Sequence, residues 1–142
     1  MVKIYPTAKI ICDEMDIEKA NYIGDYVFIY LKRLVMGEGS QINAFASATG
    51  GGELIMGRNV VVSYGARLIT GTDQPVGRYM SDSAPEEERY VVRGTIFLDD
   101  NVFIGANAVI CVNRRSPVIA IGRGTVIGAG AVSYTHLTLP TN

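Results

Sequence analysis

Aliphatic residues recur every six positions along most of this chain, and small or polar residues fill the positions between them. The period starts near Ile17 and ends near Val132, and it is clearest in residues 104–110 and 121–127. A glycine or another small residue often follows the aliphatic residue. A short period that persists along a chain indicates a repeat architecture, in which each unit is stable only against its neighbours.

A unit of six residues is too short for a helix and too regular for a loop. Each unit therefore predicts one short strand and one corner, and three units close a triangular coil of a parallel β-helix. The aliphatic residues would point inward and stack from coil to coil, and burial of each Ile or Val contributes roughly 1.5–3 kcal/mol. A β-sandwich is the alternative, but its turns recur at intervals of roughly 8–12 residues.

A second inward position lies four places after each aliphatic residue. It sits near a corner, where there is little room, so a small or β-branched side chain is expected there. The residues at this position are Ala46, Val60, Ala66, Val102, Ala108, Thr125 and Ala131.

The period breaks at three places, which are more informative than its persistence. Residues 48–53 contain three glycines and are interpreted as a turn or bulge that corrects the register between coils. Residues 72–93 are polar and mix acidic residues, arginines and tyrosines, so we expect a protruding loop that carries function, with a solvated insertion as the alternative. Residues 111–120 contain Arg114 and Arg115, which would either meet an anion or lie in a plain surface turn.

Composition narrows the classes of function. The 142 residues suffice for one domain, which we assign to residues 1–132, with residues 1–16 capping the first coil. The net charge of −1 argues against a general nucleic-acid binder, and no apolar run is long enough to predict a membrane span. Cys12 and Cys111 are interpreted as reduced thiols rather than metal ligands. With no signal peptide in residues 1–6, these features predict a cytoplasmic protein without a metal.

The hexads, the long loop and the segments 102–110 and 121–132 resemble those of the hexapeptide-repeat acyltransferases. The branch most similar is that of the sugar O- and N-acetyltransferases of polysaccharide gene clusters, related to the maltose and galactoside acetyltransferases. This resemblance implies a left-handed parallel β-helix and a homotrimer. It also implies acetyl-CoA as co-substrate, bound between subunits, and a sugar or sugar-nucleotide acceptor bound beside the loop.

The resemblance also implies site residues. In this family CoA contacts the backbone of coil corners, so the candidate cofactor-binding residues are Gly105, Ala106, Gly128 and Ala129. The candidates for contacts to the sugar are the loop residues Arg78, Asp82, Glu87 and Arg89.

The chain departs from the family where a histidine base is expected. Asp73 stands where some relatives have a histidine after the start of the loop, and Asn101 stands where others have one before a Val-x-Ile-Gly hexad. Asp73 and Asn101 are therefore the candidate catalytic residues. Three interpretations stay open: Asp73 or Asp82 is a base whose pKa is raised by partial burial, an amine acceptor needs little or no base, or the chain is a non-catalytic scaffold.

The period stops abruptly after Val132. Residues 133–142, which include His136, the one histidine of the chain, are interpreted as a non-native tail and set aside. The alternative is a natural tail that covers the open end of the last coil.

Overall fold

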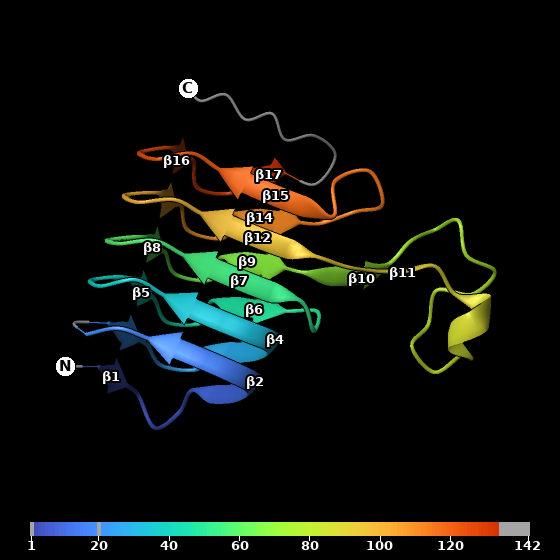
Figure 1. Cartoon of the computed structure of the whole chain (residues 1–142), viewed down its shortest axis with the longest axis horizontal. Coiled ribbons are helices and arrows are strands. Elements are labelled where there is room, and N and C mark those ends of the chain that lie inside the picture. The colour runs from blue at the N-terminus through green and yellow to red at the C-terminus, as the bar shows by residue number, and fades with distance from the viewer. Residues whose placement is uncertain (1, 20, 134–142) are drawn as a thin grey trace.

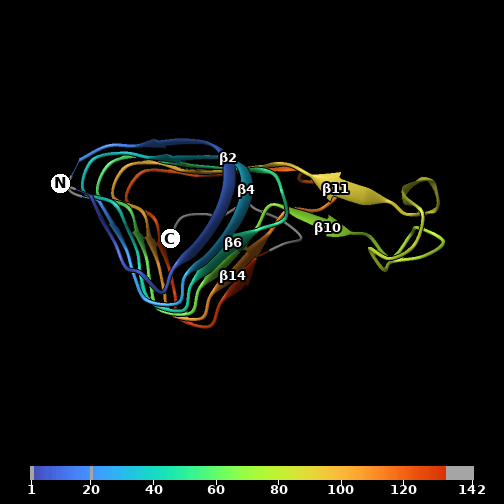
Figure 2. The ribbon, with the colours of Figure 1, turned by 90° about the horizontal axis from the view of Figure 1, so that it is seen from below.

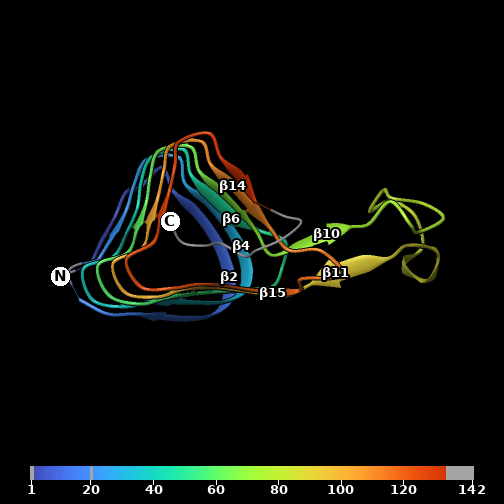
Figure 3. The ribbon, with the colours of Figure 1, turned by 90° about the horizontal axis from the view of Figure 1, so that it is seen from above.

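The computed structural model describes residues 2–19 and 21–133, and the chain forms a parallel β-helix of triangular cross-section (Figures 1 and 2). Viewed from above, the chain turns clockwise as it rises toward the viewer, so the β-helix is left-handed (Figure 3). The predicted fold class is therefore confirmed. Ser133 ends the last strand, whereas the remainder of the tail, with His136, lies outside the described residues.

One face of each coil is a two-residue strand, and six of these stack in parallel. In order, they are β1 (Lys3–Ile4), β3 (Tyr22–Ile23), β5 (Gln41–Ile42), β8 (Val61–Val62), β13 (Phe103–Ile104) and β16 (Val126–Ile127). Because a strand this short has few bonds of its own, its stability depends on the coils above and below.

The other two faces share one sheet, because β2 (Lys9–Ile17) and β4 (Phe28–Met36) run round the corner without a break. On the first half of β4 stack β6 (Ser47–Thr49), β9 (Arg67–Ile69), β14 (Val109–Cys111) and β17 (Val132–Ser133). On its second half stack β7 (Glu53–Met56), β12 (Thr95–Leu98) and β15 (Val118–Ile121).

The core is a set of aliphatic columns along the axis. Ile23, Ile42, Val62 and Ile104 are register partners in successive coils, and each is 0–1% exposed. The small residues expected near the corners are likewise at most 1% exposed at Ala46, Val60, Ala66, Val102 and Ala108. Thr125 and Ala131, in the last described coil, are half-buried.

The prediction that residues 1–16 cap the first coil is wrong, because β1 and β2 form a complete coil of their own. Ile4 is the register partner of Ile23, and Ile10 is the partner of Ile29, so the aliphatic columns continue below Ile17. The polar residues in this segment lie mainly on outward positions, which hides the period in the sequence.

All three breaks in the period lie at one corner, the one that β2 and β4 cross continuously. The turn at 50–52 joins β6 to β7, residues 70–94 join β9 to β12, and residues 112–117 join β14 to β15. Parallel stacking places these connections next to one another. The insertions therefore gather on one edge of the rod.

The first break is the register correction that the sequence indicates. Ile29 pairs with Ala48 and Leu34 pairs with Leu54, so the glycine turn adds one residue between the two faces. Gly50 and Gly51 both have positive φ, of 105° and 74°, a conformation that a side chain disfavours.

Within the described residues, no helix is long and apolar enough to cross a membrane. The helical element there is a single 3-10 turn, η1 (Glu86–Glu88), in the longest connection.

Stability should depend on the inward residue of a strand and not on its outward neighbour. Ile104→Ala leaves a cavity at a fully buried position, so we expect it to lower the free energy of unfolding by about 2–5 kcal/mol. Phe103→Ala removes a larger side chain that is 42% exposed, so its cost should be much smaller. Urea denaturation of both variants tests this order, and a reversed order would contradict the inward column.

Candidate active site

The longest connection is a ribbon that projects from the rod, as Figures 2 and 3 show. Its base is regular: β10 (Gly71–Asp73) pairs antiparallel with β11 (Val91–Arg93). The expected protruding loop is therefore present, and its base is more regular than the sequence indicates. The irregular tip carries η1.

Thr70 ties this ribbon to the coil. It is fully buried, its hydroxyl donates to the Thr49 carbonyl at 2.7 Å, and the same oxygen accepts from the Gly52 N–H at 2.8 Å. Its own carbonyl accepts from the Gly94 N–H at 2.7 Å. One threonine thus joins the glycine turn to both ends of the ribbon. The sequence signal that we missed is a polar residue two places after Leu68, on the inward side of the strand.

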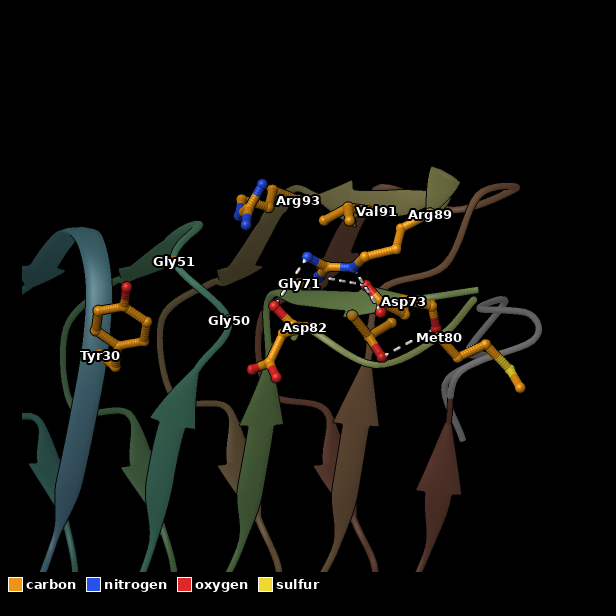
Figure 4. Close-up of a pocket in the computed structure, with 11 residues that line it drawn as sticks. Tyr30, Gly50, Gly51, Gly71, Asp73, Met80, Asp82, Arg89, Val91 and Arg93 are labelled. Atoms are coloured by element: carbon orange, nitrogen blue, oxygen red, sulfur yellow. Dashed lines mark hydrogen bonds and ion pairs between the residues drawn. The ribbon is translucent and has the colours of Figure 1, made fainter. Parts of the chain in front are cut away.

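A hollow of about 440 Å³ lies where the ribbon meets the rod. Figure 4 shows its lining, to which the ribbon contributes Asp73, Asp82 and Arg89 and the rod contributes Tyr30 and the glycine turn. This volume is within the range of about 300–1,000 Å³ that small-molecule sites occupy.

Asp73 and Arg89 form a bidentate ion pair across the ribbon. Nε of Arg89 donates to Oδ2 of Asp73 at 3.0 Å and Nη2 donates to Oδ1 at 2.8 Å, and each side chain is 11% exposed. These hydrogen bonds, aided by the charges of Arg89 and Arg93, hold the pKa of Asp73 below its ordinary value although burial opposes them. The expectation that burial raises the pKa of Asp73 is therefore wrong, and the ionised carboxylate is a weak base.

Asp82 is the other carboxylate of the hollow. Its backbone carbonyl accepts a 3.5 Å hydrogen bond from Nη1 of Arg89, which places the residue beside the ion pair. Its carboxylate points away from Arg89 in Figure 4, and within residues 2–19 and 21–133 it forms no ion pair. Asp82 thus lines the hollow as a carboxylate residue without an ion-pair partner among the described residues.

The remaining sequence candidates lie elsewhere. Arg78 is 72% exposed at the ribbon, 3.5 Å from Glu88, and Glu87 is an exposed residue of η1; neither lines the hollow. Asn101 lies in the turn between β12 and β13, where its N–H donates to the Arg58 carbonyl at 2.9 Å. The structure thus brings together Asp73, Asp82 and Arg89. Sequence reasoning missed Arg93 and Tyr30, which carry no motif.

The four candidate cofactor residues do lie together, at the corner that follows the six-stranded sheet. The Gly105 N–H donates to the Ile127 carbonyl and the Gly130 N–H donates to the Ala106 carbonyl, both at 2.8 Å, so the turn at Gly128 and Ala129 stacks on that at Gly105 and Ala106. A Cβ on Gly105 would lie 2.5 Å from the Ala129 nitrogen. Close stacking of the coils therefore accounts by itself for the glycine at 105.

A set of metal ligands is absent from the part of the chain that the structure describes. No group of three or more His, Cys, Asp or Glu side chains there is placed to hold a metal ion.

Comparison with solved structures finds the same fold in an N-acyltransferase. The chain superposes on AntD, an N-acyltransferase from Bacillus cereus in complex with dTDP and 3-hydroxybutyryl-CoA, with a TM-score of 0.78 and 23% identity, over 92% of this chain and 68% of that one. A serine-to-alanine variant of AntD in complex with dTDP-4-amino-4,6-dideoxyglucose and coenzyme A gives a TM-score of 0.80, with the same identity and coverage. This likeness establishes a shared fold.

Comparison of the sequence with protein families and curated proteins does not assign the chain to a family. No protein-family model matches the chain, and no curated protein matches it.

The Thr70 hydroxyl should stabilise the junction between the ribbon and the rod. Thr70→Val keeps the shape and leaves the Gly52 N–H without its acceptor, so we expect a loss of about 1–3 kcal/mol in the free energy of unfolding. Thr70→Ser keeps the hydroxyl and should recover most of it. Chemical denaturation compares the three proteins, and a valine variant as stable as the parent would contradict this role.

The Asp73–Arg89 ion pair should make the stability of the ribbon fall at acid pH. Because the folded-state pKa of Asp73 lies below its ordinary value of 3.8, the pair stabilises the ribbon fully above that pH and loses its effect as the pH falls through the lowered pKa. Arg89→Gln removes the hydrogen bonds and should raise the titration midpoint of Asp73, as followed by carboxyl-carbon NMR. Arg78→Gln, which removes a different ribbon ion pair, should leave the midpoint in place; equal midpoints in all three proteins would contradict the assignment.

Proposed function

We propose that this chain is an acyl-CoA-dependent acyltransferase that acylates the amino group of a sugar nucleotide. The observation that carries the proposal is the hollow at the ribbon base, where the Asp82 carboxylate, which forms no ion pair among the described residues, lies beside the Asp73–Arg89 ion pair. The fold shared with AntD, whose structures hold coenzyme A and a dTDP-linked amino sugar, supports the choice of donor and acceptor.

An amine acceptor suits a site without histidine. A neutral amine attacks a thioester directly, so the nitrogen–carbon bond forms and the carbon–sulfur bond then breaks, with the proton lost from nitrogen reaching the leaving thiolate or solvent. The amine arrives largely as an ammonium, and the Asp82 carboxylate would orient it and accept its proton. The Asp73 carboxylate is held by Arg89, so it would position Arg89 and the ribbon rather than act as the base.

Finer features are also part of the proposal. We take the acyl group to be acetyl, the setting to be polysaccharide biosynthesis in the cytoplasm, and the assembly to be a homotrimer. Coenzyme A would contact the stacked corner at Gly105, Ala106, Gly128 and Ala129. Asn101 lies on a different corner from the ribbon, so it would reach the reaction only from a neighbouring subunit.

A further part of the proposal concerns the ribbon tip. Arg78 and Glu87 lie outside the hollow and would contact only the distal part of the acceptor. They are therefore expected to affect acceptor affinity more than the rate of the chemical step.

A non-catalytic scaffold is the second candidate. It is favoured by the lowered pKa of Asp73 and by the lack of a histidine in residues 2–19 and 21–133. A scaffold would neither bind coenzyme A nor release thiol from acyl-CoA.

The test is transfer to matched acceptors. Protein is incubated with acetyl-CoA or 3-hydroxybutyryl-CoA and with dTDP-4-amino-4,6-dideoxyglucose or dTDP-glucose, while thiol release and product mass are followed. We expect release with the amino sugar and little with the hydroxy sugar. Asp82→Asn should lower kcat/KM by about 100-fold, the size of a typical proton-transfer contribution.

Asp13→Asn is the matched control, because Asp13 is an exposed aspartate of the first coil. It should leave the rate unchanged. Absence of both thiol release and coenzyme A binding would select the scaffold, whereas release with the hydroxy sugar alone would overturn the amine assignment.

A further inference from the structure

The charges of the hollow leave one cation without a strong partner. Of its four charged side chains, Asp73 and Arg89 neutralise each other, which leaves Asp82 and Arg93. The carboxylate nearest Arg93 in an ion pair is that of Glu86, at 3.9 Å, and the two side chains are 52% and 73% exposed. An ion pair so long and so exposed contributes little, so the Arg93 guanidinium remains available for a ligand.

The neighbours of the Arg93 side chain include two glycines, which leave space around it. Arg93 ends β11 and faces Gly71 across the ribbon, where a Cβ on Gly71 would lie 3.0 Å from Cγ of Arg93. A Cβ on Gly51 would lie 3.5 Å from its Nε. The stem of Arg93 therefore packs on bare backbone at the foot of the ribbon, and no side chain of these two residues shields the guanidinium.

A guanidinium in this setting matches one ligand chemistry. Its planar fork of N–H groups binds phosphate oxygens in pairs, and it stays charged at every physiological pH. The same hollow offers Asp82 to a cation, so its two free charges suit a ligand with an anionic group at one end and an amine at the other. A sugar that carries an amine and a phosphate ester has this distribution.

We propose that Arg93 is the residue that recognises the phosphate of the acceptor and so restricts the enzyme to phosphorylated sugars. This inference rests on the proposed function, because it assigns the acceptor of the same hollow. The phosphate lies against Arg93 at the foot of the ribbon, and the amine faces Asp82. Arg93 thereby sets specificity, and the acyl transfer itself takes place at the other end of the sugar.

The test separates binding from transfer. Isothermal titration with dTDP measures phosphate recognition without any reaction, and Arg93→Gln should weaken dTDP binding by about 10- to 100-fold, the usual size of a charge-assisted contact. In the transfer assay the same variant should raise the KM of dTDP-4-amino-4,6-dideoxyglucose by a similar factor, with kcat and the KM of acyl-CoA nearly unchanged. Comparison with 4-amino-4,6-dideoxyglucose 1-phosphate shows whether one phosphate suffices.

Two variants serve as controls. Glu86→Gln removes the partner of Arg93 and should bind dTDP at least as well as the parent, whereas a structural ion pair would make this variant behave like Arg93→Gln. Arg58→Gln removes an arginine with a similar 3.8 Å contact, to Glu38, on a distant corner, and should change nothing.

The possible results discriminate between the two proposals. Binding of dTDP that depends on Arg93 supports the inference even if no acyl transfer is found. Unaltered dTDP binding by Arg93→Gln, no dTDP binding by the parent, or a rise in the KM of acyl-CoA alone would overturn it, and acyl transfer in the parent would then still support the proposed function.

Discussion

The coils of this protein depend on the stacking of inward aliphatic side chains at a fixed spacing along the axis. Ile23, Ile42, Val62 and Ile104 occupy one column and are almost fully buried. A displaced coil would lose its own burial and that of both neighbours, because each strand is too short to be stable alone. Extra residues can therefore enter only at a corner, where they leave these columns intact.

That constraint explains the position of the hollow. The glycine turn, the ribbon and the connection at 112–117 leave the rod at the same corner of successive coils, so the hollow forms between the ribbon and the turn. Thr70 replaces an inward aliphatic residue at this corner and uses its hydroxyl to hold the two segments together. The mutual neutralisation of Asp73 and Arg89 then leaves Asp82 and Arg93 as the charges that a ligand meets.

The fold could be predicted from the sequence because the period of six is a local property that repeats. The first coil was missed because polar outward residues such as Lys9, Asp13 and Glu14 hide the inward Ile4 and Ile10. The site was predictable only in part. The loop was located, but the pairing of Asp73 with Arg89, sixteen residues apart, depends on the antiparallel register of the ribbon, and that register has no signature in the sequence. Arg93 has no motif either, and its place beside Gly51 arises from the stacking of separate coils.

The corner that carries the ribbon also sets how such a protein can diversify. β2 and β4 cross this corner as continuous strands, whereas the later coils leave it through connections of different lengths. The core therefore accepts either a continuous strand or an inserted connection at the same position. Selection can lengthen, shorten or exchange the outgrowth at one coil without repacking the next. The rod can thus support different outgrowths, and a ribbon from a different β-helix, grafted between Thr70 and Gly94, would bring its own ligand preference with it.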